Sequence, residues 1–247
     1  SGRYTIENTG INSDKSDYGS AIFGNKVIFA SARDTGGLSP RKFKWTNEGY
    51  TNLFSADMGE EGVLTKAERF GGKLNSRFHE STPVFTKDGK TVYFTRNNYL
   101  DKRGYDGNKV TLLKIYRATL VDSLWTNITV LPFNSDSYQV ANPALSNDGK
   151  TLYFASRGHV GMGGFDIYKT SADENGAYIL PVNLKSPVNS SFDDFSMIVE
   201  TGGERGYLTS NRTGGKGGDD IYQFELPPLV FSLKGVVTDS KTGAILT

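Results

Sequence analysis

Residues 83–98 read Pro83-Val84-Phe85-Thr86-Lys87-Asp88-Gly89-Lys90-Thr91-Val92-Tyr93-Phe94-Thr95-Arg96-Asn97-Asn98, and residues 143–156 repeat them as Pro143-Ala144-Leu145-Ser146-Asn147-Asp148-Gly149-Lys150-Thr151-Leu152-Tyr153-Phe154-Ala155-Ser156. In both stretches an Asp-Gly turn joins two apolar runs. This is the strongest short-range signal for a β-hairpin, because glycine tolerates positive φ. The second run is apolar or alternating, as in a half-buried strand. The two stretches therefore predict two copies of one hairpin.

The hairpin belongs to a longer pattern that occurs four times in the 247 residues, at a period of 55 to 63 residues. Each unit has an Asn-Ser pair, an acid or amide five residues after the Asn, and two aromatic strands. The pairs are Asn12-Ser13, Asn75-Ser76, Asn134-Ser135 and Asn189-Ser190, followed by Asp17, Glu80, Gln139 and Asp194. The second aromatic strands contain Leu53-Phe54, Ile115-Tyr116, Ile167-Tyr168 and Ile221-Tyr222. About four short strands per unit, here named a to d in chain order, predict an all-β propeller with four visible blades.

The two ends of the array predict how the ring closes. Residues 4–7 read as a strand before the first Asn-Ser pair, whereas the last unit has strands a to c but no strand d before Pro227-Pro228. We expect residues 3–8 to pair with residues 220–225 and complete the last blade, which would remove exposed sheet edges. An open fragment of a larger ring is the alternative.

The pattern changes after Pro227-Pro228. Residues 230–239 alternate as a strand, and Ser240-Lys241-Thr242-Gly243 follows as a turn. This segment resembles the first strand of a carboxypeptidase-regulatory-like β-sandwich. We therefore expect the β-propeller to span residues 1–226, and residues 227–247 to be a linker and the start of a truncated sandwich of that kind, from a longer parent protein.

Composition argues against several functional classes. The formal net charge is +1, which gives no electrostatic reason to expect a nucleic-acid partner. No apolar stretch approaches the 18 residues of a membrane helix, so we expect no direct membrane span. The absence of cysteine rules out disulfides and thiolate metal sites.

The repeats carry a family resemblance. Together with Gly163-Gly164-Phe165-Asp166-Ile167-Tyr168 and residues 214–222, the two hairpins are similar to TolB-type, WD40-like (PD40) propeller repeats. They most resemble the propeller of PorE-like OmpA-family proteins of Bacteroidetes, over roughly residues 3–240. The resemblance implies a periplasmic, outer-membrane-associated component of the type IX secretion and gliding machinery, with protein partners there. Peptidoglycan binding would come only from an OmpA-like domain that this chain lacks, and relatives often carry one more unit between the third and the fourth.

A candidate binding face follows from the propeller geometry, because the d-to-a and b-to-c connections of every blade emerge on the same side. Conspicuous loops on a rigid scaffold commonly carry function, and Trp, Tyr and Arg are favoured interface anchors. The candidates are Asp17, Arg33, Trp45, His79, Glu80, Arg96, Tyr99, Tyr105, Arg157, His159, Asp193, Asp194 and Arg212. The favoured structural interpretation of the repeated Arg and acid positions is that each blade satisfies its own buried polar groups.

The sequence lacks the signatures of common catalytic sites. His79 and His159 are its only histidines, and it contains neither a His-Glu-x-x-His nor a Gly-x-Ser-x-Gly motif. We expect no cofactor, although a calcium site at Asp219 and Asp220 stays open. The sequence therefore favours a non-enzymatic protein–protein interaction scaffold. The alternative is a propeller that binds glycan or peptidoglycan fragments, with Trp45 and tyrosines as stacking platforms, and a hydrolase is the third and least favoured reading.

Overall fold

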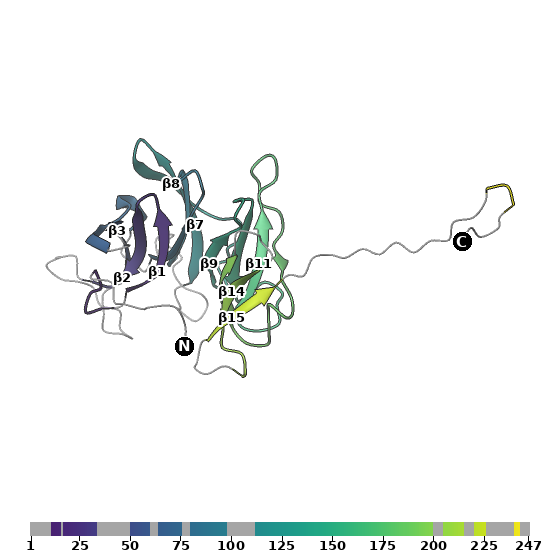
Figure 1. The fold of residues 1–247 in the computed structure, drawn as a ribbon. Coiled ribbons are helices and arrows are strands. Elements are labelled where there is room, and N and C mark those ends of the chain that lie inside the picture. The colour runs from purple at the N-terminus through teal and green to yellow at the C-terminus, as the bar shows by residue number, and fades with distance from the viewer. Residues whose placement is uncertain are drawn as a thin grey trace.

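The structure is a computed structural model that describes residues 11–15, 17–33, 50–59, 64–75, 80–97, 112–199, 205–214, 220–225 and 240–242. Within these ranges the chain forms fifteen strands and one short 3-10 helix, η2 (Gly72–Leu74). The strands form four antiparallel sheets in chain order, with the first sheet on the left of Figure 1 and the fourth on the right. The expectation of an all-β fold is confirmed.

Each sheet corresponds to one repeat unit. Unit one contains β1 (Asp17–Phe23), β2 (Lys26–Ser31), β3 (Asn52–Met58) and β4 (Leu64–Arg69). Unit two contains β5 (Glu80–Phe85), β6 (Thr91–Asn97), β7 (Leu113–Val121) and β8 (Leu124–Val130). Unit three contains β9 (Val140–Leu145), β10 (Thr151–Ser156), β11 (Asp166–Ser171) and β12 (Val182–Asn183). Unit four contains β13 (Asp194–Val199), β14 (Arg205–Ser210) and β15 (Asp220–Glu225).

The two hairpins that the sequence predicts are present as β5–β6 and β9–β10. Their turns place Gly89 at φ 65° and Gly149 at φ 72°, the left-handed region that glycine adopts without steric cost. Asp88 Oδ1 accepts hydrogen bonds from Thr86 Oγ1 at 2.6 Å and from the Lys90 amide at 3.0 Å, and Asp148 has the same two bonds in unit three. The Asp-Gly signal therefore acts through local turn chemistry.

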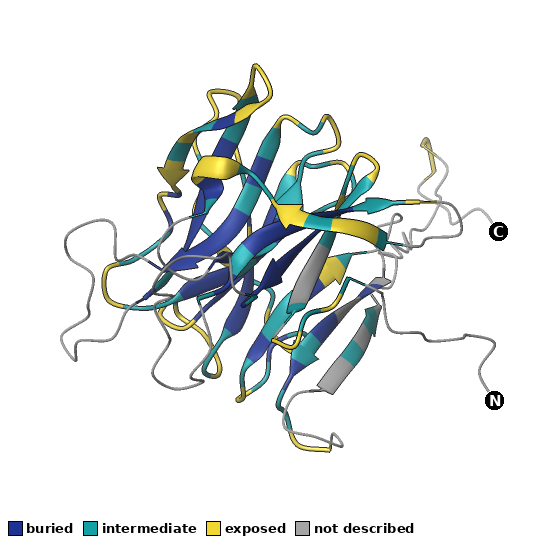
Figure 2. Cartoon of the chain, turned by 90° about the vertical axis from the view of Figure 1, so that its left-hand side faces the viewer, coloured by how far each residue is buried: buried dark blue, intermediate teal, exposed yellow. Residues whose placement is uncertain are grey.

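Apolar side chains hold neighbouring sheets together face to face. Ile28 and Leu53 of unit one pack with Phe94 and Trp125 of unit two in one cluster. Similar clusters join unit two to unit three and unit three to unit four. Figure 2 shows the buried residues in the middle of the sheets and the exposed ones at turns and outer strands. Because burial of each large side chain contributes about 1.5–3 kcal/mol, these contacts hold neighbouring units together.

The first strands of the four units lie innermost, around a common axis. β1, β5, β9 and β13 line a central cavity of about 460 Å³. Each of the four pairs with its second strand through a register shift, and three of the shifts hold a non-glycine residue in the left-handed region: Thr82 at φ 46°, Asn142 at φ 55° and Ser196 at φ 50°. Such β-bulges increase local twist, which helps the inner strands to converge.

The expectations about the two ends fall largely outside the described residues. Residues 3–8 are among those not described, so their pairing with β15 stays a prediction. Of the segment 227–247, only the turn at residues 240–242 is described, so the domain boundary also stays a prediction. In the described part of the chain, no helix is long and apolar enough to cross a membrane.

Candidate functional site

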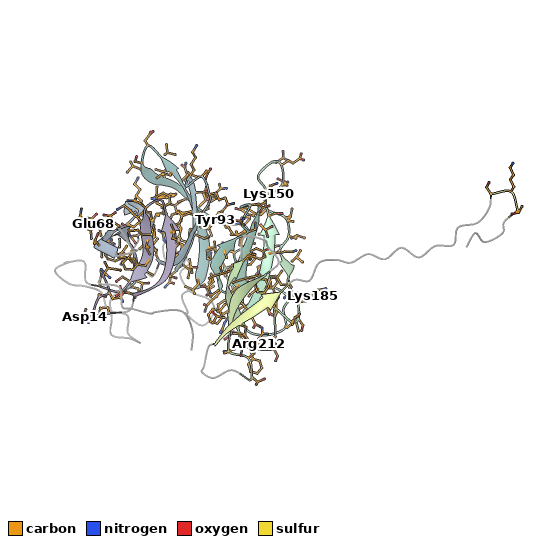
Figure 3. The ribbon with its side chains drawn as sticks, viewed as in Figure 1. Asp14, Glu68, Tyr93, Lys150, Lys185 and Arg212 are labelled. Atoms are coloured by element: carbon orange, nitrogen blue, oxygen red, sulfur yellow. The ribbon has the colours of Figure 1, made fainter. Side chains whose placement is uncertain are left out.

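The repeated polar residues gather at one end of the sheets. In unit one Asp17 lies opposite Ser31, and Ser31 lies opposite Asn52, so the start of strand a, the end of strand b and the start of strand c coincide. We call this end, with the described residues of the Asn-Ser loops and the b-to-c connection of unit three (157–165), the motif face. Figure 3 shows Asp14 and Arg212 of the motif face at the lower edge, and Lys150 of an a-to-b turn at the upper edge.

Unit one holds a compact ion pair on the motif face. Arg33 donates to Asp17 Oδ1 at 2.8 Å, to Ser31 Oγ at 2.8 Å and to the Ile11 carbonyl at 2.8 Å. Its guanidinium lies 5.1 Å from the centres of the Phe29 and Phe54 rings. The amide and hydroxyl of Ser13 donate to the other carboxylate oxygen of Asp17. The cation is thus held by an acid, a carbonyl and two aromatic faces.

Unit four repeats this arrangement. Arg212 donates to Asp194 Oδ1 at 2.5 Å, to Ser210 Oγ at 3.0 Å and to the Val188 carbonyl at 2.6 Å, and it lies 5.0 Å from the Tyr222 ring centre. Ser190 donates twice to Asp194 Oδ2, as Ser13 does to Asp17. The serine of the Asn-Ser pair therefore binds the acid in units one and four.

Unit two builds the same pair from a different position. Arg96 occupies the strand end that Ser31 and Ser210 occupy elsewhere, and its Nε donates to Glu80 Oε1 at 3.0 Å. The guanidinium donates to the Leu74 carbonyl and lies 4.9 Å from Phe94 and 5.3 Å from Tyr116. Glu80 is fully buried and Arg96 is only 4% exposed. The interpretation that each unit satisfies its own polar groups is confirmed for units one, two and four.

Unit three departs from this arrangement. The register places Val140, not Gln139, opposite Ser156, so a buried valine stands where the other units have an acid. The alignment of Gln139 with the acids is therefore wrong by one residue. The reason is the loop length: β9 begins six residues after Asn134, whereas the other inner strands begin five residues after their Asn.

An imidazole replaces the guanidinium in unit three. His159 Nδ1 lies 2.8 Å from Ser156 Oγ, and its ring lies 5.7 Å from Phe154 and 5.0 Å from Tyr168. Ser156, Phe154 and Tyr168 stand at the positions of Ser31, Phe29 and Phe54, which hold the arginine in unit one. Burial lowers the pKa of His159 and so favours the uncharged imidazole. The sequence singled out His159 as a candidate but gave no sign of this replacement.

Arg157 serves a different purpose from the arginines of the other units. It donates to both carboxylate oxygens of Asp193, at 3.1 and 3.0 Å, and lies 4.7 Å from the Phe165 ring centre. Asp193 also accepts from the Phe165 amide at 2.7 Å. The expectation that Arg157 satisfies its own unit is therefore wrong, because its partner belongs to the loop that leads into unit four.

The asparagines of the Asn-Ser pairs fasten each unit to the one before it. Asn189 accepts from the Ile167 amide at 2.8 Å and donates to the Ile167 carbonyl at 2.9 Å. Asn75 bonds in the same way to Leu53, and Asn134 to Ile115. The side-chain amide thus imitates one more residue of a paired strand. Sequence reasoning found the repeated Asn but not this role.

The glycines before Asp166 permit close contact between units three and four. A Cβ on Gly163 would lie 2.1 Å from the Phe192 carbonyl oxygen, and the Gly164 amide donates to that oxygen at 3.2 Å. Asp166 Oδ2 accepts from the amides of Met162 and Gly163. The Gly-Gly motif is therefore explained by backbone packing.

A pocket of about 530 Å³ opens beside His159. Its walls include Phe133, Tyr138, His159, Tyr168, Tyr178 and Leu180. None of its twelve lining residues is an aspartate, glutamate, lysine or arginine. Tyr138 is held against Gly158, where an added Cβ would lie 1.9 Å from the tyrosine ring. We call this cavity the third-unit pocket, because it lies in the unit that lacks the ion pair.

Several candidates lie outside the described residues. These are Trp45, His79, Tyr99, Tyr105, Asp219 and the side chain of Asp220. The described residues include no group of three or more His, Asp or Glu side chains placed to hold a metal ion. The calcium site at Asp219 and Asp220 therefore stays a hypothesis.

No family model matches this chain, and no curated protein matches it. Among solved structures, one described as a glycoside hydrolase aligns over 86% of this chain and 67% of its own, with 9% identity and a TM-score of 0.50. That structure has a propeller-type fold. This chain folds as a β-propeller.

Two further structures align less closely. A puromycin hydrolase aligns over 95% of this propeller and 39% of its own chain, with 13% identity and a TM-score of 0.48. A candidate 6-phosphogluconolactonase from Bacteroides uniformis aligns over 92% and 54%, with 15% identity and a TM-score of 0.44. This propeller thus spans about half the length of the lactonase candidate and less of the hydrolase. The likeness to the glycoside hydrolase, at 9% identity, shows the fold alone.

Proposed function

We propose that this propeller is a non-enzymatic binding module that holds a protein partner on its motif face. The observation that carries the proposal is how the polar residues are used. In units one, two and four the acid and the arginine are bound to each other, and the third unit presents an uncharged pocket instead. The repeated residues therefore build a rigid scaffold, and the variable unit offers the surface.

The environment of the acids supports a binding role over hydrolysis. Burial by itself would raise the pKa of Asp17, but hydrogen bonds with Ser31, Arg33 and Ser13 outweigh it and lower the pKa to about 2. A carboxylate held ionised in this way has no proton to donate near neutral pH. Asp193 and Asp194 bind different arginines, Arg157 and Arg212, so they do not face each other as a catalytic pair.

The setting that we propose is a periplasmic, outer-membrane-associated complex of the type IX secretion or gliding machinery. The resemblance of the repeats to PorE-like propellers supports this proposal. The partner would then be a protein of that machinery, and peptidoglycan would be reached only through a separate domain.

A glycan-binding propeller is the second candidate function. The observation that favours it is the aromatic lining of the third-unit pocket, in which Phe133, Tyr138, Tyr168 and Tyr178 take part. Aromatic rings can stack on sugar faces, so a muropeptide or oligosaccharide is the occupant to test against a protein.

The test is a cross-linking pull-down from cell envelopes with the tagged chain. Arg157→Ser changes a half-exposed residue of the motif face, and Lys150→Ser changes a turn on the opposite face. We expect an outer-membrane or secretion protein to be captured by the unaltered chain and by Lys150→Ser, but less by Arg157→Ser. Capture of cell-wall fragments alone would support the glycan candidate, and substrate turnover that is lost on Asp194→Asn would support a hydrolase.

A further inference from the structure

The third-unit pocket has no acidic side chain, lysine or arginine in its walls. In units one, two and four a guanidinium neutralised by an acid stands where unit three has the imidazole of His159, and Val140 stands in unit three where the others have the acid. An ionic group entering this pocket would lose water and find no counter-charge among the lining residues. The chemistry of the walls therefore selects an uncharged occupant.

The rim of the pocket is apolar. Val160 is 95% exposed and Leu180 is 87% exposed, and both line the opening together with the half-exposed Ile179. A single exposed aliphatic side chain is ordinary on a protein surface. Three of them around one aromatic pocket form the kind of patch that marks an interaction site.

The polar groups of the pocket are mostly used inside the protein. The Asn134 amide bonds to Ile115 and Leu131, the Tyr168 hydroxyl donates to the Val160 carbonyl, and the Tyr178 hydroxyl donates to Tyr93 Oη at 3.1 Å. A sugar ring carries several hydroxyls that would need partners on burial. This arrangement favours an apolar side chain over a sugar.

A second, shallower pocket adjoins the first and shares Val160 and Asn183 with it. It is lined by Met162 and by Lys185, which lies at the outer edge of unit three in Figure 3. Lys185 has no carboxylate partner among the described residues. A partner that covers both pockets would therefore complement this surface best with an acidic residue next to the apolar one.

We propose that the third-unit pocket docks an extended segment of a partner protein, which inserts a large uncharged apolar side chain beside His159 and sets an acidic residue against Lys185. The proposal rests on the proposed function and names the chemistry of the partner. The proposed binding mode is insertion of a side chain and not pairing with β12, which is a two-residue edge strand preceded by Pro181.

The test uses nuclear magnetic resonance titration of the full chain with short blocked peptides. The probe is acetyl-Ala-Trp-Ala-Asp-Ala-amide, compared with versions in which Gly replaces Trp or Lys replaces Asp, and with methyl β-glucopyranoside. We expect saturable shifts at the amides of Val160, Leu180 and Lys185 with the Trp-Asp peptide. Binding should weaken at least tenfold without Trp and a few-fold with Lys in place of Asp.

Matched variants separate docking from folding. Leu180→Asp and Val160→Asp should weaken peptide binding at least tenfold, whereas Leu124→Asp, at a leucine of β8 that is 66% exposed, should leave it unchanged. All three sites are exposed, so the fold is retained and a preserved spectrum checks it. In Lys185→Ser the Asp and Lys peptides should bind equally well.

Three results would overturn the proposal. Shifts with the glucoside but not with the peptides would assign the pocket to a sugar, and shifts that grow with protein concentration alone would assign it to a second copy of the chain. Absence of any shift, while the pull-down still recovers a partner, would place docking elsewhere and leave the proposed function intact. If the peptide binds but the pull-down recovers no protein, the pocket proposal is supported and the proposed envelope partner is not.

Discussion

Arg157 and Asp193 form an ion pair across the boundary between units three and four, with one guanidinium nitrogen donating to both carboxylate oxygens at 3.1 and 3.0 Å. The arginine is 47% exposed and the aspartate 23% exposed, so solvent screens their attraction. The Glu80–Arg96 pair of unit two has the same charges but is almost completely buried. Two ion pairs of the same charges thus differ greatly in burial.

Removal of Arg96 should therefore be far more costly than removal of Arg157. We expect Arg96→Ala to lower the free energy of unfolding by about 3–5 kcal/mol, because Glu80 would be left buried without its cation. Arg157→Ala should cost less than about 1 kcal/mol. Urea unfolding followed by tryptophan fluorescence measures both, and equal losses would show that burial does not control the two pairs.

Stability should depend on Asp17 at acid pH. The lowered pKa of about 2 means that the folded state keeps this carboxylate ionised below the ordinary value of 3.8. The resulting stabilisation is complete above about pH 5 and is lost as pH falls toward 2, and it amounts to about 2 kcal/mol. Asp17→Asn should remove this part of the pH dependence in urea unfolding at pH 6, 4 and 2.5.

The exposed neighbour of Asp17 provides the control for that experiment. Asp14 is 83% exposed, so Asp14→Asn should leave the pH dependence of unfolding almost unchanged. If Asp14→Asn and Asp17→Asn flatten the curve equally, general surface charge and not the Asp17–Arg33 pair explains the acid sensitivity.

Gly163→Ala should disturb the contact between units three and four. The new methyl group would meet the Phe192 carbonyl at 2.1 Å, and this backbone atom moves only with its whole loop. We expect a loss of about 1–3 kcal/mol on thermal or urea unfolding. Gly24→Asn is the control: Gly24 has φ 60° and open space around its Cα, and asparagine tolerates this conformation. A loss as large in the control would contradict the packing explanation.

Closure of the ring can be tested through Asn12. Asn75, Asn134 and Asn189 each bond to the apolar residue that directly precedes the aromatic residue of strand c in the preceding unit, so the repeat predicts that Asn12 bonds to Ile221. Asn189→Ala should cost about 1–3 kcal/mol because it leaves buried backbone groups unpaired. We expect a smaller but measurable loss for Asn12→Ala, because Asn12 is exposed whereas Asn189 is buried, and almost none for Asn175→Ala at an exposed turn. Stability unaffected by Asn12→Ala would contradict this form of closure.

Parts of the candidate site could be predicted from the sequence, because a fixed spacing within each unit determines them. Asp17, Glu80 and Asp194 stand at the same position relative to their Asn, and this spacing matched their shared partnership with an arginine. The same rule failed in unit three, where one additional loop residue shifted the strand and brought Val140 to the place of the acid. A one-residue shift reverses which side chains face the core, and no local propensity reveals it.

The sequence by itself determined the all-β class, the four units and the hairpins, because strand alternation and Asp-Gly turns are set by residues next to each other in the chain. The tertiary structure alone decided that Arg157 binds Asp193, that His159 replaces a guanidinium and that a pocket opens beside it. These features depend on how neighbouring sheets pack and on which side chains meet across loops. Contacts that only one unit makes leave no periodic trace in the sequence.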